Sequence, residues 1–108
     1  MSEVPRRLKL GPHRFTIDSE PATGRLLRDE DARGDSRPDQ LLIRIDTDRP
    51  HSAVAETLLH EALHCAWHLT SLRSYHDSDA EEAVVAALSP LLLEMLQRNP
   101  KLVTYLLD

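Results

Sequence analysis

One stretch constrains this chain more than any other: residues 56–68, which contain the pattern His-Glu-x-x-His. Apolar residues recur around the pattern at spacings of three and four, and no glycine or proline interrupts them, which predicts an amphipathic helix over residues 52–72. On such a helix His60 and His64 lie one above the other on the same face. Their imidazole nitrogens can therefore reach a single metal ion.

The glutamate of the motif, Glu61, follows the first histidine and lies outside the stripe that the two histidines form. Its carboxylate can lie beside a metal ion without binding it, which is the place of a general base that deprotonates a metal-activated water. The alternative is a pair of core histidines that never meet a metal. Burying two imidazoles and a carboxylate together costs free energy unless they have a partner, and this cost favours the metal site.

A catalytic zinc site takes three protein ligands and keeps a fourth position for water. His68 extends the histidine stripe, but eight helical residues put it about 12 Å along the axis from His60. We therefore interpret His68 as a residue outside the metal shell. The remaining candidates are acidic residues just after the motif helix: Asp77, Asp79, Glu81 and Glu82.

Helix phase separates the two glutamates of this group. Apolar residues at helical spacing predict a second helix over residues 80–98, and Glu81 falls at the centre of its apolar face. Glu82 lies about 100° away from Glu81 on the same helix. A carboxylate within an apolar face needs a strong partner, so we expect Glu81 to be the third ligand, with Glu82 as the second choice. A salt bridge, or a favourable place in the first helical turn, is the alternative role of Glu81.

The residues before the motif helix predict a small sheet within residues 6–46. Residues 6–10 and 13–18 alternate between apolar and polar side chains on either side of a Gly-Pro turn, which is typical of a hairpin. Residues 40–46, with the sequence QLLIRID, form the clearest strand.

The region between these strands contains turn-forming and charged residues. Residues 20–24 are expected to form a turn and residues 25–28 a short strand, whereas residues 29–39 are charged, contain glycine and proline, and predict a mobile loop. The chain is then an α+β domain over residues 1–108. We expect an antiparallel or mixed sheet of about three strands on two main helices, the first carrying the motif, and a short final helix or tail at residues 101–108.

Composition limits the classes of function. The chain has 108 residues and a net charge of −5, enough for one modest core. Residues 51–108 hold 3 Lys+Arg against 8 Asp+Glu, which argues against nucleic-acid binding by the helical half. The single cysteine, Cys65, excludes an internal disulfide and is interpreted as a small core residue. Without a signal-like or membrane-spanning apolar run, we expect a cytoplasmic protein that does not bind membranes.

The motif, followed by an acidic pair that opens a second helix, resembles the gluzincin clan of zinc metallopeptidases. The small size is similar to that of the minigluzincins and of the metallopeptidase-like proteins of phages, which are related to the ImmA/IrrE type. The resemblance covers residues 40–92. It implies that zinc is bound by His60, His64 and either Glu81 or Glu82, and that Glu61 is the general base.

The resemblance also implies a place for the substrate. In the clan, an edge strand ahead of the motif helix commonly holds a peptide, and residues 40–46 occupy that place in this chain. The clan often has an asparagine before the ligand glutamate, and Ala80 precedes Glu81 here.

Two functions remain in competition at this point. The first is zinc-dependent peptide hydrolysis in an active, latent or regulatory form, acting on a peptide or protein. The second is a catalytically degenerate zincin-like domain that binds zinc and a protein partner. For the enzyme, Tyr75 and His76 between the two helices are candidates to stabilise an oxyanion, with Tyr105 as a third. The alternative for Tyr75 and His76 is that both are ordinary loop residues.

Overall fold

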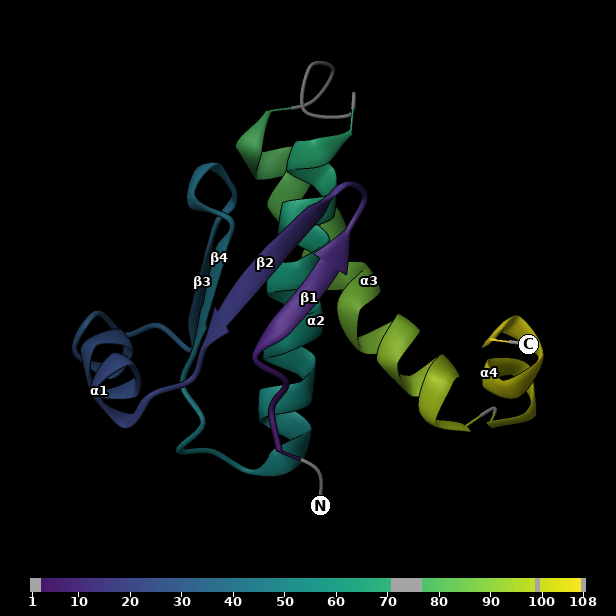
Figure 1. Cartoon of the computed structure of the whole chain (residues 1–108), viewed down its shortest axis with the longest axis horizontal. Helices are drawn as coiled ribbons and strands as arrows, with labels where there is room; N and C mark the ends of the chain where they lie inside the picture. The colour runs from purple at the N-terminus through teal and green to yellow at the C-terminus, as the bar shows by residue number, and fades with distance from the viewer. Residues whose placement is uncertain (1–2, 71–76, 99, 108) are drawn as a thin grey trace.

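The computed structural model describes residues 3–70, 77–98 and 100–107, and these residues form a mixed sheet and four helices (Figure 1). The fold is α+β with two long helices, as the sequence predicted, and its sheet has four strands. In chain order, the elements are β1 (Arg7–Leu10), β2 (His13–Asp18), α1 (Pro21–Asp29), β3 (Gly34–Arg37), the 3-10 turn η1 (Pro38–Gln40), β4 (Leu42–Ile45), α2 (His51–Leu69), α3 (Ser78–Arg98) and α4 (Pro100–Leu107).

The sheet has the strand order β1-β2-β4-β3, in which β2 and β4 are parallel and the other two pairs are antiparallel. The predicted hairpin is confirmed, because β1 pairs with β2 across a turn at Gly11, which has a φ of 57°. A positive φ of this kind carries no steric penalty for glycine. Along β2 the side chains alternate, so that Phe15 and Ile17 are buried and their neighbours are not.

The hydrophobic core lies between the sheet and α2. Four strand residues meet two residues of α2 there, and the cluster consists of Phe15, Ile17, Ile43, Ile45, Val54 and Cys65. Burial of one large apolar side chain stabilises a fold by about 1.5–3 kcal/mol, so this cluster fixes α2 across the sheet. The interpretation of Cys65 as a core residue is confirmed, since it is fully buried.

The position of β4 corrects the prediction about the substrate strand. Residues 40–46 were expected to form an edge strand, but β4 lies between β2 and β3, and both of its backbone edges are paired. The edge strand beside α2 is β3, which the sequence predicted as part of a mobile loop. The charged residues of this segment were interpreted as typical of a loop. In the structure Asp35 instead forms a double hydrogen bond with its cross-strand neighbour Arg44.

The segment predicted as a turn at 20–24 and a strand at 25–28 is a helix, α1. Pro21 suits the first turn of a helix, and the carboxylate of Asp18 accepts hydrogen bonds from the Glu20 backbone N–H (3.1 Å) and the Thr23 hydroxyl (2.8 Å). Gly24 was interpreted as part of a turn. In the structure it allows α1 to approach Asp46 closely, because a Cβ at this position would lie 2.8 Å from Oδ1 of Asp46.

The two long helices agree closely with the predicted ranges. The motif helix α2 spans His51–Leu69. Helix α3 spans Ser78–Arg98 and continues through Pro90. Helix α3 packs against α2, whereas α4, expected as a short final helix or a tail, is a helix that lies apart from the sheet in Figure 1. None of the helices in the described ranges combines the length and apolar character that a membrane span requires.

Candidate metal centre

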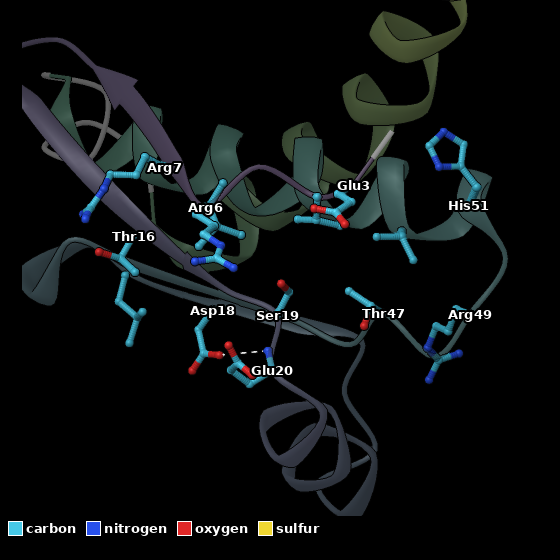
Figure 2. A pocket seen from close by; sticks show the side chains of 14 residues that line it. Glu3, Arg6, Arg7, Thr16, Asp18, Ser19, Glu20, Thr47, Arg49 and His51 are labelled. Carbon is cyan, nitrogen blue, oxygen red and sulfur yellow. Dashed lines mark hydrogen bonds between the residues drawn. The ribbon is translucent and has the colours of Figure 1, made fainter. Parts of the chain in front are cut away.

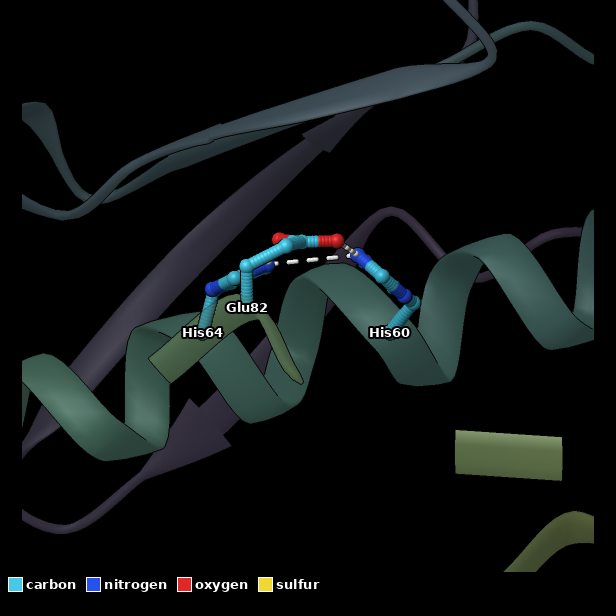
Figure 3. Close-up of side chains that lie close together, drawn as sticks. All are labelled: His60, His64 and Glu82. Carbon is cyan, nitrogen blue, oxygen red and sulfur yellow. Dashed lines mark hydrogen bonds and ion pairs between the residues drawn. The ribbon is translucent and has the colours of Figure 1, made fainter. Parts of the chain in front are cut away.

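The two motif histidines converge on one point above α2, as the four-residue spacing predicted. Their Nε2 atoms lie 3.2 Å apart and their ring centroids 4.8 Å apart. Figure 3 shows both rings directed toward a carboxylate from α3. His60 and His64 are half-buried, with 25% and 14% of their side chains exposed. Their ligand atoms can therefore be reached from solvent but are held in place.

The carboxylate belongs to Glu82. Its Oε1 lies 3.3 Å from Nε2 of His60, and its Oε2 lies 2.7 Å from Nε2 of His64. His60, His64 and Glu82 form a group whose ligand atoms all lie within 4.8 Å of one another, and such a group could hold a metal ion. Tetrahedral zinc ligands at about 2.0–2.2 Å from the ion stand about 3.3 Å from each other. Two of the three separations, 3.2 Å and 3.3 Å, match this spacing and the third, 2.7 Å, is shorter, so the group could hold a metal ion of this kind.

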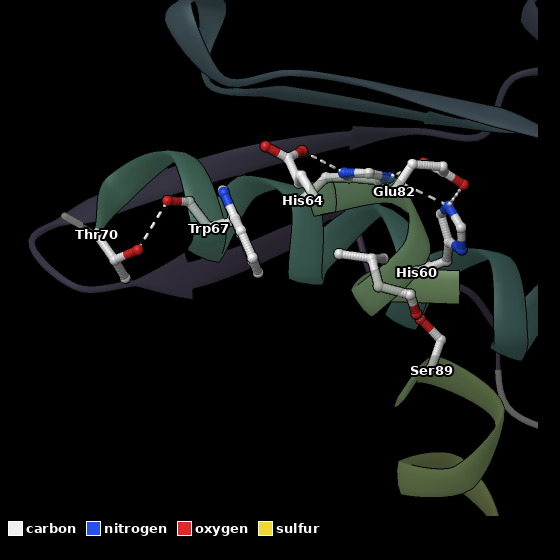
Figure 4. A network of polar contacts seen from close by, with 8 residues as sticks. His60, His64, Trp67, Thr70, Glu82 and Ser89 are labelled. Atoms are coloured by element: carbon white, nitrogen blue, oxygen red, sulfur yellow. Dashed lines mark hydrogen bonds and ion pairs between the residues drawn. The ribbon is translucent and has the colours of Figure 1, made fainter. Parts of the chain in front are cut away.

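Glu81 occupies a different place from the one that helix phase favoured. Its Oε2 lies 2.5 Å from Nδ1 of His64. Figure 4 shows the other side of the His64 ring directed toward Glu82 and His60. A carboxylate in this place holds Nδ1 protonated and directs the lone pair of Nε2 outward. The geometry thus favours Glu82, the second choice, as third ligand and assigns Glu81 to the support of His64.

Glu82 takes the place expected for Glu81 because of the way in which α3 packs against α2. The sequence argument assumed that the most apolar stripe of α3 faces the core. In the structure, the side of α3 that faces α2 carries Glu82, Val85 and Ser89, and the last two are 2% and 0% exposed. The stripe centred on Glu81 instead contains exposed residues such as Leu88 and Leu91.

Glu61 is buried in α2 beside this group, with 8% of its surface exposed. Burial raises the pKa of its carboxyl above the usual value, while the imidazoles of His60 and His64 and a hydrogen bond with Ser36 oppose that shift. Ser36 lies on the edge strand β3, so the carboxylate stands between the motif helix and the open edge of the sheet. Ser36 was not predicted as a site residue, because its segment was predicted as a loop.

A cavity of about 320 Å³ opens beside Glu61. It is bounded by the start of β3, by α2 and by one residue of α3: Ala32, Arg33, Gly34, Glu56, Thr57, His60, Glu61 and Ala86. Gly34 is required here, because a Cβ would lie 2.8 Å from Cγ2 of Thr57 and 2.9 Å from the carbonyl oxygen of Arg44. The edge strand therefore runs close to the motif helix at the mouth of the cavity.

A larger hollow of about 760 Å³ lies at the carboxyl ends of β2 and β4 (Figure 2). Its rim carries cations such as Arg6 and Arg49 together with acids such as Glu3 and Glu20, so it presents no single sign of charge. It contains none of the residues of the histidine cluster. The smaller cavity is therefore the one that the chemistry of the site favours.

The remaining candidate residues lie outside the cluster. His68 is half-buried, and its Nε2 lies 3.3 Å from Oδ1 of Asp39. Burial raises the pKa of the Cys65 thiol to about 12, with smaller contributions from the nearby Glu61 and Glu81, so this side chain stays a neutral thiol. Tyr105 is 78% exposed on α4, apart from α2 (Figure 1). Tyr75 and His76 lie outside the described residues.

Comparison with known proteins gave no significant match to a family model, to a curated protein or to a solved structure. The functional conclusion therefore depends on the residues of the site and on their geometry.

Proposed function

We propose that this protein is a zinc-dependent peptidase of the gluzincin type, similar to the minigluzincins. One observation carries the proposal: His60, His64 and Glu82 converge beside the buried carboxylate of Glu61. A histidine pair that served only packing would not need a third ligand-type side chain from another helix. A structural zinc site, in turn, would not need an additional carboxylate beside its ligands.

The chemistry divides between the ion and the chain. A bound zinc ion would supply the Lewis acid that polarises a peptide carbonyl and acidifies water. Glu61 lines the same cavity as His60, so its carboxylate can take the proton of an attacking water and return it to the leaving amine. His64, held by Glu81 through Nδ1, keeps the lone pair of its Nε2 available to the ion.

The substrate class is a peptide in extended conformation. Within the described residues β3 is an edge strand, and an extended peptide can add to such an edge through backbone hydrogen bonds. A peptide along residues 34–37 would pass the cavity beside Glu61, where a small side chain can enter. In this proposal the substrate lies along β3, one strand away from the segment that the sequence suggested.

A zincin-like domain that binds zinc and a partner without cleaving it is the second candidate. The cavity of about 320 Å³ favours it, because this volume is at the small end of the range of about 300–1,000 Å³ for ligand cavities and leaves little room for a deep substrate cleft. The two candidates differ in the role of Glu61. Only the peptidase requires a base at that position.

The test is a comparison of the wild type with Glu61→Gln, which keeps size and shape but removes the base. Both proteins are incubated with zinc and either unfolded casein or a random peptide library. We expect cleavage by the wild type and a loss of at least about 100-fold in Glu61→Gln, while bound zinc stays at the wild-type level. Glu30→Gln, at the exposed end of α1, is the matched control and should cleave like the wild type.

The outcomes separate the candidates. Equal cleavage by the wild type and Glu61→Gln would contradict the role of Glu61. Zinc binding without cleavage by any variant would leave the partner-binding domain in place of the peptidase.

A further inference from the structure

The first hairpin is a basic segment in a chain that is acidic as a whole. The chain has a net charge of −5, yet residues 4–17 contain four cations and neither Asp nor Glu. The four cations are Arg6, Arg7, Lys9 and Arg14, and all of them are exposed. Positive charge is therefore concentrated at β1 and β2, on the opposite side of the sheet from the edge strand β3.

Strand pairing places three of these cations on one face of the sheet. Leu8 pairs with Phe15, and both contribute to the core between the sheet and α2. Because side chains alternate between the two faces along a strand, Arg7, Lys9 and Arg14 share the opposite, outer face. In Figure 1, β1 and β2 lie in front of α2, and none of the described helices covers their outer side. We call these three cations the hairpin face.

The hairpin face contains two like charges in direct opposition. Lys9 lies opposite Arg14 in the pairing of β1 with β2, and like charges in such positions destabilise a sheet. A lysine on an edge strand is explained by protection against pairing with another chain. That explanation does not extend to Arg14, because β2 is an interior strand. A bound anion would offset the repulsion, so this pair indicates a negatively charged ligand.

No described acid neutralises the hairpin face. None of its three cations forms an ion pair with a described residue, whereas five other arginines do: Arg28, Arg37, Arg44, Arg49 and Arg98. Two acids share the outer face, and both have partners. Asp18 accepts hydrogen bonds at the start of α1, and Asp35 accepts them from Arg44. The positive charges of the hairpin face are therefore available to an external partner.

We propose that the hairpin face binds the phosphate backbone of double-stranded nucleic acid without reading its sequence. Contacts between cations and phosphates supply the affinity of such sequence-independent binding. A single strand is bound in addition through aromatic rings on which its bases stack. Of Phe, Tyr and Trp, the strands β1 and β2 contain only Phe15, which is buried on the other face. The exposed phosphates of a duplex therefore fit this face better than a single strand does.

Two other kinds of negatively charged partner fit the hairpin face less well. A protein partner is held by large apolar side chains at the centre of an interface, and a segment that lies on a membrane inserts apolar side chains beside its cations. The large apolar side chains that are exposed in the described ranges all lie on helices. The hairpin face thus offers charge without an apolar anchor, which suits a phosphate backbone.

The acids of the helical half lie away from the hairpin face. Helix α3, which carries Asp79 and Glu81 in its first turn, packs on α2, and α2 in turn packs on the inner face of the sheet. Charges farther apart than about 8 Å are largely screened at physiological ionic strength. A duplex that approaches the outer face is therefore attracted by the hairpin face more than it is repelled by the helical half.

Fluorescence anisotropy of a labelled duplex of mixed sequence, titrated with the full chain, measures the proposed binding. We expect a dissociation constant between about 1 and 100 µM at about 50 mM salt, as in weak sequence-independent binding. Three phosphate contacts predict that the affinity falls about 40-fold between about 50 mM and about 200 mM salt. An affinity that does not change with salt would overturn the proposal.

The variant Lys9→Glu separates binding from folding. It turns the like-charge pair with Arg14 into a pair of opposite charges, so the temperature of thermal unfolding should rise by about 1–5 °C. The affinity for the duplex at about 50 mM salt should nevertheless fall at least about 50-fold, because one contact is reversed and Arg14 is neutralised. Arg7→Gln leaves that pair unchanged and should lose about 10-fold. Arg25→Glu, exposed on α1, is the matched control and should bind like the wild type.

Three further results would overturn the proposal. The first is an equal loss of affinity in Arg25→Glu and Lys9→Glu, which would indicate attraction by the overall charge. The second is a wild type that does not bind the duplex, whether or not it sediments with vesicles that contain phosphatidylserine. The third is tighter binding of labelled polyglutamate than of the duplex, which would indicate an acidic protein segment. None of these readouts requires bound zinc or peptidase activity.

Discussion

In the half of the molecule formed by the sheet and α2, large apolar side chains are buried, and Phe15 and Ile43 have no exposed surface. In the half formed by α3 and α4, side chains of the same kind are exposed, with Leu91 at 64% and Leu107 at 81%. Hydrophobicity alone therefore does not tell which stripe of a helix is the core side. We call the half formed by the sheet and α2 the firm half, because its large apolar side chains are buried.

The candidate metal centre lies where these two halves meet. The firm half supplies His60 and His64, whereas α3 supplies Glu82 and the supporting Glu81. Packing holds α3 through Val85 and Ser89, which are buried on its α2 side. A metal ion would therefore join the two halves and restrict the position of α3.

The largest expected effect contrasts the two halves directly. Phe15→Ala removes a fully buried ring and should lower the free energy of unfolding by about 3–5 kcal/mol. Leu91→Ala should change it by less than about 0.5 kcal/mol, because Leu91 is 64% exposed. Urea unfolding of both variants measures the two values. Equal losses would show that α3 contributes a buried core of its own.

The next effect concerns zinc and the position of α3. Zinc at about 1,000 times its dissociation constant stabilises the state that binds it by about 4 kcal/mol. We expect a chelator to accelerate amide hydrogen exchange in α3 more than in β2, since α3 opens when its link to α2 is lost. Exchange that changes equally in both elements would mean that the two halves open as one unit.

A smaller effect is expected from Glu81. Glu81→Ala removes the carboxylate on Nδ1 of His64 and should weaken zinc binding by about 10–100-fold, which a competition titration with a chromophoric chelator measures. Nitrogen NMR of His64 should show a mixed tautomer in place of one protonated at Nδ1. Glu81→Gln, which keeps a hydrogen-bond acceptor, should restore part of the affinity. A loss of zinc in Glu81→Ala larger than in Glu82→Ala would return the ligand role to Glu81.

The smallest effect belongs to the firm half. Arg44 lowers the pKa of Asp35 below its usual value through a hydrogen bond and charge. A lowered folded-state pKa adds stability above the unfolded value of about 3.9 and loses it as the pH falls through the folded-state value. Asp35→Asn should cost about 0.5–1 kcal/mol near neutral pH and progressively less below about pH 4. A cost that is the same at pH 3 and pH 7 would exclude this ion pair as its source.

The sequence predicted those parts of the fold that depend on local periodicity. The hairpin around Gly11, the motif helix and the second helix follow from alternation and helical spacing, and so does the convergence of His60 and His64. Side-chain contacts between distant segments were not predictable in this way. The strand β3 depends on Asp35 meeting Arg44, and α1 depends on Gly24 approaching Asp46.

The third ligand shows the same limit within the site. The angular positions of residues around α3 separate Glu81 from Glu82, but they do not show which side of the helix faces α2. That side is set by the buried Val85 and Ser89, whereas Leu88 and Leu91 of the more apolar stripe are exposed. The choice between the glutamates therefore required the packing of the two helices.

The most direct test of the metal centre is the zinc content of protein purified without a chelator or a histidine tag. Elemental analysis is made on the wild type, on His64→Ala and on the matched control His68→Ala. The wild type and His68→Ala should each contain one zinc per chain, because His68 contacts Asp39 outside the cluster. His64→Ala should contain none. A full complement of zinc in His64→Ala, or none in the wild type, would contradict the metal centre.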